Sequence, residues 1–390
     1  MTRTAGFLLA FTFAVAVPVF AQDPKTAAEA AFKGDVHAAA GLTCQSCHTG
    51  PATAAAPYSP IPRGSVAASC AKCHSDAAYI HKFNPQLRVD QMAQYLTSKH
   101  GQDQAKGETR TATCTDCHSS HGVVRVKDTR SPVAPMNVAK TCAKCHTDPV
   151  RMKPFNHETN QFSDWSSSVH ADALLKRGDT SAPTCTTCHG SHGATPPNTS
   201  EVANVCAQCH VREADFFMKS PKKAIFEGMG QAQCLVCHGN HAIHPPTPKL
   251  VGLDKDAVCS QCHDDSSNGS TTIKKFREGL EGLSTAMTSA TDVVDLAEHS
   301  GMLVDDARAL LHDAREQNVL ARVSVHAFAP EPFTGVQAKG MEAAHKAAQA
   351  GQNALAELQS RRRGLGVATL LIVGFLITLA IKIRKLPKPE

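Results

Sequence analysis

The chain has 390 residues and a formal net charge of +5, from 40 basic and 35 acidic residues. One tryptophan and three tyrosines leave few aromatic anchors, which argues against an ordinary hydrophobic core. All 16 cysteines fall into Cys-x-x-Cys pairs, and a histidine directly follows each pair. This regularity indicates that every cysteine pair binds the same kind of chemical group.

The first 21 residues have the pattern of a secretory signal. Arg3 supplies the positive n-region, residues 7–17 form the apolar h-region, and Ala21 precedes the expected cleavage before Gln22. An uncleaved membrane anchor is the alternative, and the small residue at the cleavage position favours removal. We therefore expect the remainder of the chain to be exported.

Eight copies of the cysteine motif occupy residues 44–263. The cysteines are Cys44, Cys47, Cys70, Cys73, Cys114, Cys117, Cys142, Cys145, Cys185, Cys188, Cys206, Cys209, Cys234, Cys237, Cys259 and Cys262. The adjacent histidines are His48, His74, His118, His146, His189, His210, His238 and His263. Histidine makes up 21 of 390 residues, so chance would place one after a given pair roughly one time in 19 (390/21). A thiol pair followed by imidazole is the attachment signature of haem c, with two thioethers and a proximal iron ligand.

Other uses of paired cysteines explain the pattern less well. Zinc sites do not require histidine in the fifth position each time, and a thioredoxin-like motif normally occurs once. Disulfide scaffolds belong to short secreted domains. We therefore expect eight covalently attached haem c groups, whose faces supply apolar surface. Their sixteen propionates would shift the net charge to about −11, which removes the argument for nucleic-acid binding.

An internal repeat groups the eight motifs into four pairs. The first motif of the second, third and fourth pairs has a second histidine three residues on, at His121, His192 and His241. A Ser-x-His sequence precedes the second and third pairs, ending at His100 and His170. The leading pair differs, because only His37 lies upstream and Pro51 stands where the second histidine is expected.

Histidines outside the motifs are the candidate distal iron ligands. Nine precede Cys259, close to the number that bis-histidine coordination of eight irons requires: His37, His81, His100, His121, His157, His170, His192, His241 and His244. The repeated offsets favour His100, His121, His170, His192 and His241, and a surface or core histidine stays an alternative for the other four. Before the last pair, Lys222 replaces histidine in Ser220-Pro221-Lys222. Either His244 binds that iron, or one haem has lysine, water or no sixth ligand.

The paired motifs and the Cys-x-x-Cys-His-x-x-His variant resemble the multihaem cytochromes of metal-, sulfur- and nitrate-respiring bacteria, over about residues 37–263. The resemblance implies that His121, His192 and His241 each bind the iron of a neighbouring haem. The sequence between motifs is rich in Pro, Gly, Ser, Thr and Asp. We therefore expect a mainly α fold with much irregular structure, in which residues 22–268 wrap around the haems.

The composition changes after Thr271 to that of long helices. Within residues 273–297, 304–325 and 341–358, apolar residues recur at alternating steps of three and four. They predict a three-helix antiparallel bundle or stalk at 269–363, with roughly 25 residues and 40 Å per helix. We expect its histidines to be solvated, except that His326 would reach a haem if the bundle folds back; the others are His299, His312 and His345.

An uncharged apolar run from Leu365 to Ile381 follows, near the shortest length that spans a bilayer. The basic residues after it favour the cytoplasm: Lys382, Arg384, Lys385 and Lys388. We expect a transmembrane helix at 364–383, a cytoplasmic tail at 384–390 and the bulk of an inner-membrane protein in the periplasm. A buried core helix is the alternative.

These features predict electron transfer between membrane quinol-side donors and periplasmic or outer-membrane acceptors. The expected partners are redox proteins, such as a membrane quinol-oxidising complex and other cytochromes. A multihaem reductase of a small nitrogen or sulfur oxyanion is the alternative, with an open iron position near Lys222. A haem-storage or assembly scaffold is a third possibility.

Overall fold

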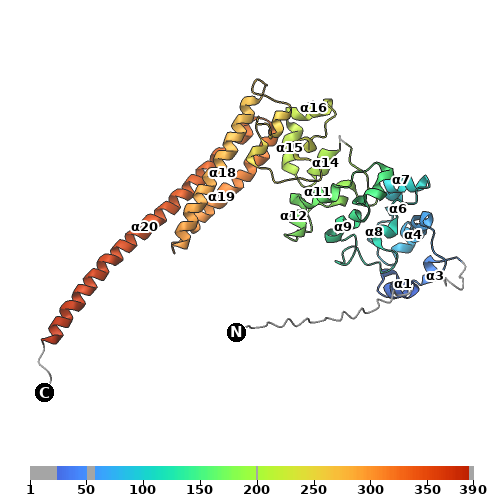
Figure 1. Ribbon diagram of the computed structural model, residues 1–390, viewed down its shortest axis with the longest axis horizontal. Coiled ribbons are helices and arrows are strands. Elements are labelled where there is room, and N and C mark those ends of the chain that lie inside the picture. The colour runs from blue at the N-terminus through green and yellow to red at the C-terminus, as the bar shows by residue number, and fades with distance from the viewer. Residues whose placement is uncertain (1–23, 51–57, 199–200, 386–390) are drawn as a thin grey trace, which may run out of the picture. The chain divides into compact units, whose positions relative to one another are not determined.

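The computed structural model describes residues 24–50, 58–198 and 201–385 (Figure 1). Within these ranges every regular element is a helix, and much of the chain between helices is irregular. The expected mainly helical fold is confirmed. The predicted signal at 1–21 and most of the predicted tail lie outside the described residues.

The chain forms two compact units, Met1–Phe162 with Ala173–Thr195, and Ser163–Asp172 with Pro196–Glu390. The first unit contains motifs one to five on short helices. Its elements are α1 (Pro24–Phe32), α2 (Val36–Ala39), α3 (Cys44–Cys47), η1 (Arg63–Ser65), α4 (Val66–His74), α5 (Ala77–Ile80), α6 (Gln91–Thr97), α7 (Lys99–Ala105), α8 (Cys114–His118), α9 (Pro135–His146), α10 (Pro149–Met152), η2 (Lys153–Phe155) and α13 (Cys185–His189). The chain passes between the units at three points: within α11 (Gln161–Ser166), within α12 (Val169–Leu175) and after Thr195.

The second unit contains motifs six to eight and all of the long helices. Its elements are α14 (Val202–Ala207), α15 (Val211–Lys219), α16 (Pro221–Gly228), α17 (Cys234–His238), η3 (Pro248–Leu250), η4 (Val258–Gln261), α18 (Ser270–His299), α19 (Asp305–Ser324), η5 (Val325–Ala327) and α20 (Pro330–Arg384). Motifs six to eight thus share a unit with α18, α19 and α20.

The long helices α18 and α19 pack against the first half of α20 (Figure 1). Leu283 of α18, Leu311 of α19 and Phe333 of α20 are almost completely buried. Glycine lets α20 approach closely, because a Cβ at Gly340 would lie 3.0 Å from the methyl carbons of Leu283. Burial of these apolar side chains holds the three helices together.

The third helix and the apolar run form one continuous helix rather than two. The prolines at 330 and 332 lie in the first turn of α20, where a missing N–H costs no helical hydrogen bond. No proline interrupts the helix between there and Arg384, so its 55 residues are unbroken. Among the described residues α20 is the one helix long and apolar enough to cross a membrane. Its apolar end is exposed, with Leu370 at 74 % and Leu371 at 70 %.

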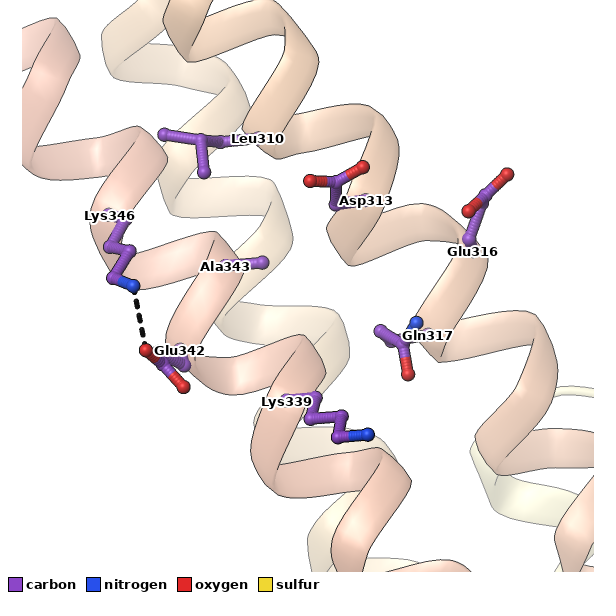
Figure 2. A pocket seen from close by; sticks show the side chains of 8 residues that line it. All are labelled: Leu310, Asp313, Glu316, Gln317, Lys339, Glu342, Ala343 and Lys346. Atoms are coloured by element: carbon purple, nitrogen blue, oxygen red, sulfur yellow. Dashed lines mark ion pairs between the residues drawn. The ribbon is translucent and has the colours of Figure 1, made fainter.

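A shallow groove separates α19 from α20 on one side (Figure 2). Its lining is mostly charged, and Lys346 and Glu342 form an ion pair of 2.7 Å along α20. Exposed Asp313 and Glu316 project from α19 on the facing side (Figure 2). Exposed charges on both helices, with an ion pair along α20, are expected of a water-facing surface.

Candidate haem-binding site

Threonine fixes the start of three of the motif helices. Thr43, Thr113 and Thr184 each precede the first cysteine as the N-cap of α3, α8 or α13. Each forms a capping box, in which the side chain three residues on accepts from the threonine backbone N–H. The two cysteines of each motif therefore lie on a single short helical turn. All 16 cysteines are described, and none forms a disulfide.

A buried polar residue caps each helix that carries an upstream ligand candidate. The Ser98 side chain accepts from the N–H of Gly101 at 3.0 Å, and that of Ser168 accepts from Ala171 at 3.2 Å. Ser220 stands in the same place before α16. In the leading repeat Asp35 caps α2 by accepting from the N–H of His37 at 2.9 Å. The second residue after each cap is His37, His100, His170 or Lys222.

The residue between cap and ligand bonds to a loop of the following repeat. The N–H of Val36 donates to the carbonyl of Val123 at 2.8 Å, and Lys99 donates to Ala194 at 3.2 Å. Val169 donates to Ile243 at 2.9 Å in the same way. Each acceptor lies two residues after a second histidine of the Cys-x-x-Cys-His-x-x-His variant. The last repeat has Pro221 at this position, which has no N–H to donate.

A left-handed residue ends each of the three variant motifs. Ser119, Gly190 and Gly239 directly follow the proximal histidine and have φ of 71°, 80° and 73°. Glycine adopts this conformation freely, whereas serine is strained there. The turn stops the motif helix and redirects the chain that carries the second histidine.

Three upstream histidines face the proximal histidine of the second motif in their own pair. The ring centroids are 6.0 Å apart for His37 and His74, 6.1 Å for His100 and His146, and 6.4 Å for His170 and His210. In the last pair the Nζ of Lys222 lies 2.8 Å from the Nε2 of His263. Lysine thus takes the place that histidine has in the other repeats.

Second histidines face the first motif of the preceding pair. His121 lies 6.1 Å from His48 with ring planes 21° apart, and His192 lies 6.1 Å from His118 at 18°. In both pairs the second histidine therefore faces the proximal histidine of an earlier motif, not that of its own motif.

The proximal His238 faces a histidine from the long helices. His326 of η5 lies 6.0 Å from His238, with ring planes 20° apart. His326 was outside the set of candidate ligands that the sequence offsets defined. A signal was present, because Ser324-Val325-His326 repeats Ser168-Val169-His170.

These separations fit an iron between the rings. A metal–imidazole bond of about 2 Å on each side, with half the width of each ring, gives roughly 6 Å between centroids. Burial lowers the pKa of His74, His118 and His238, and it lowers that of His146 to about 4. The rings are therefore neutral at pH 7 and present the lone pair that a metal binds.

Hydrogen bonds at Nδ1 orient several of these rings. The Nδ1 of His48 donates to the carbonyl of Ser59 at 2.8 Å, and that of His326 donates to Val323 at 3.0 Å. His189 bonds the carbonyl of Thr195 at 3.3 Å, and His37 donates to the carboxylate of Asp35 at 2.8 Å. Such bonds fix the tautomer that leaves Nε2 available to a metal.

The remaining candidates have different surroundings. The Nε2 of exposed His81 donates to the carbonyl of Leu87 at 3.0 Å, and His244 is exposed. No ring contact joins either one to a proximal histidine within the described ranges. The ring of exposed His157 lies 5.9 Å from that of His146. His100 lies beside the same proximal histidine, so the two compete for one ligand position. His241 occupies the same repeat position as His121 and His192.

Neighbouring motifs touch within each unit. The side chains of Cys70 and Cys114 lie close enough for each to shift the pKa of the other, which brings motifs two and three together. Cys142 and Cys185 influence each other in the same way, as do Cys206 and Cys234. The helices that carry motifs three and four, and those of seven and eight, also pack together. Groups attached to these cysteines would therefore lie close to one another.

Comparison with known proteins agrees with this chemistry. Residues 36–147 match the family described as cytochrome c3, and residues 227–268 match the family described as the doubled CXXCH motif. A multiheme cytochrome, MtrA of Shewanella baltica (strain OS185), is 28 % identical over 163 residues, which are 38 % of this chain and 45 % of that protein. The chain thus spans less than half the length of that relative. No solved structure matches the present chain. The motifs and these similarities identify the chain as a multihaem c-type cytochrome, which binds haem c covalently.

Proposed function

We propose that the chain carries eight haems c, one on each motif, and passes electrons along them between membrane donors and periplasmic acceptors. The observation that supports this most directly is the second nitrogen-bearing side chain, histidine or lysine, that faces a proximal histidine at seven of the motifs. An iron with six protein and porphyrin ligands has no free position for substrate. Electron transfer needs no such position, and the protein then tunes potentials through axial ligands, burial and hydrogen bonds.

The ring pairs support a ligand assignment for six of the haems. His121, His37 and His192 serve the haems of motifs one, two and three. His100 serves motif four in preference to His157, because it is half-buried and holds the same capped position as His170. His170 serves motif six, and His326 serves motif seven.

The contacts between motifs support rapid exchange within each unit. Motifs two to five are linked in order by thiol contacts or packed helices, and motifs six to eight are linked likewise. The ligands add further links, because His121 connects the loop of motif three with the haem of motif one. A haem that is reduced in such a chain has neighbours to which it can pass the electron.

The apolar half of α20 supports an anchor in the inner membrane. We propose that residues 364–383 span the bilayer, that the tail at 384–390 is cytoplasmic, and that the packed helices before it form a stalk in the periplasm. Removal of everything after Arg363 should release the protein into the soluble periplasmic fraction with all of its haems. Persistence of the truncated chain in the membrane fraction would contradict the anchor.

The alternative as an oxyanion reductase requires an open iron position. The sequence allows an open iron position near His263. In the structure Lys222 lies within hydrogen-bonding distance of that histidine. The neighbouring Lys223 pairs with Glu227 at 3.0 Å, which reduces the positive charge that it offers to an anion. These contacts favour the electron carrier.

Spectroscopy of the full-length holoprotein tests the proposal. Haem content per chain should be eight, and electron paramagnetic resonance of the resting oxidised protein should show low-spin iron throughout. In phospholipid vesicles the protein should accept electrons from a quinol-oxidising partner and reoxidise with a soluble cytochrome. A large high-spin fraction, or haems that fail to exchange electrons during potentiometry, would contradict the electron-transfer chain.

A further inference from the structure

The last proximal histidine faces an amine instead of an imidazole. The Nζ of Lys222 lies 2.8 Å from the Nε2 of His263, and both side chains are half-buried. Within the described residues no carboxylate forms an ion pair with Lys222. A lysine that contacts a ring nitrogen and forms no ion pair among the described residues needs an explanation other than a surface ion pair.

Lys222 holds the same position of the repeat as the histidine ligands, although Ser220 makes no side-chain cap bond and Pro221 has no N–H to donate. Ser220 is buried and has the extended backbone of an N-cap, with φ of −81° and ψ of 159°. The ligand candidate is the second residue after the cap, as His100 is after Ser98. Proline at 221 suits the first position of a helix. The backbone geometry of the repeat is therefore retained while the ligand type changes.

Aromatic side chains cover one side of the amine. Phe328 lies with its ring centroid 5.9 Å from the Nζ, and its backbone has a positive φ of 51°. Phe217 packs edge-on against Phe328 at 6.4 Å. Phe328 directly follows η5, the helix that carries His326, and it shields one side of Lys222 from water.

We propose that the amine of Lys222 is the sixth ligand of the haem attached at Cys259 and Cys262, opposite His263. This rests on the proposed attachment of a haem to the eighth motif. Iron between the two nitrogens requires about 4 Å, twice a metal–nitrogen bond. The distance of 2.8 Å is shorter than this, and rotation about the side-chain torsions of Lys222 would provide the additional distance. Axial-ligand identity is a main determinant of haem potential, so this haem differs from the bis-histidine haems.

Near-infrared magnetic circular dichroism of the holoprotein tests the assignment, because amine–imidazole and bis-imidazole low-spin haems have charge-transfer bands of different energy. We expect one haem in eight to have the amine–imidazole band. In Lys222→His this band should disappear and the bis-imidazole intensity should rise correspondingly. In Lys222→Ala one haem in eight should become high-spin. Lys223→Ala, on the next residue of α16, should leave the spectrum unchanged.

Haem content and far-ultraviolet circular dichroism of each variant show whether it has folded and matured. A wild-type spectrum with only bis-imidazole bands, or a Lys222→His spectrum that still contains the amine band, would overturn the assignment. Failure of the electron-transfer proposal has a different signature, since the wild-type protein would then contain more than one high-spin haem or fewer than eight haems.

Discussion

The imidazole of His326 lies 6.0 Å from that of His238, nearly parallel to it, although the two belong to a long-helix segment and a cysteine motif. In earlier repeats the residue that faces the proximal histidine of the first motif is the second histidine of the next repeat. His121 faces His48 in this way. No further repeat follows the eighth motif. The loop at the end of α19 supplies the missing ring, so the long helices complete the last part of the site.

Replacement of His326 by alanine should therefore change a single haem. The iron of the seventh motif would lose its sixth protein ligand and become high-spin at rest. The electron paramagnetic resonance spectrum should gain high-spin signal equal to one haem per chain, with total haem content unchanged. His312→Ala, at an exposed position of α19, is the matched control and should have the wild-type spectrum. A low-spin spectrum in His326→Ala would show that another residue binds this iron.

Asp35 should be the most costly of the aspartate caps to remove. Its buried carboxylate accepts from the N–H of His37, the Nδ1 of His37 and the N–H of Val123. Alanine would leave all three donors without their acceptor, at about 1–3 kcal/mol for a buried group. Asp76→Ala removes an exposed cap with one bond and should cost about 1 kcal/mol. Urea titration of the two variants measures the difference, and equal costs would contradict the special place of Asp35.

Ser119 should be replaceable by glycine with a gain in stability. Its φ of 71° is strained for serine, and the equivalent residues Gly190 and Gly239 are already glycine. Relief of the strain should raise the free energy of unfolding by about 1 kcal/mol. The control is Ser75→Gly, which has a φ of −106° at the end of α4 and should give no gain. A loss of stability in Ser119→Gly would show that the serine side chain compensates for its backbone.

Two glycines of α20 should respond to alanine in opposite directions. A Cβ at Gly340 would lie 3.0 Å from Leu283 and 3.1 Å from Gln317, so Gly340→Ala should push α20 away from its neighbours. The expected cost is about 1–3 kcal/mol. Gly335 has nothing within 4 Å, and Gly335→Ala should instead stabilise the helix by up to about 1 kcal/mol. Thermal melting of both variants followed by circular dichroism decides the question. A gain in Gly340→Ala would mean that the helices separate readily.

The sequence by itself determined the chemistry of this protein. A cysteine pair and an adjacent histidine are covalent requirements for haem c, so the motif can be read without a fold, and the similarities to known cytochromes confirm that reading. The mainly helical character and the apolar C-terminal helix were also accessible, because periodicity and composition are local properties. The structure adds that the third helix and the apolar run are one unbroken helix, α20.

Only the tertiary structure decided which ligand faces which proximal histidine. Partners such as His121 and His48 lie in different repeats, and their approach depends on backbone bonds such as that from Val36 to Val123. It also distinguished His100 from exposed His81, whose ring nitrogen is engaged by Leu87, and it brought His326 to His238. Sequence offsets count candidates, but coordination depends on distance and orientation in three dimensions, which long-range packing sets.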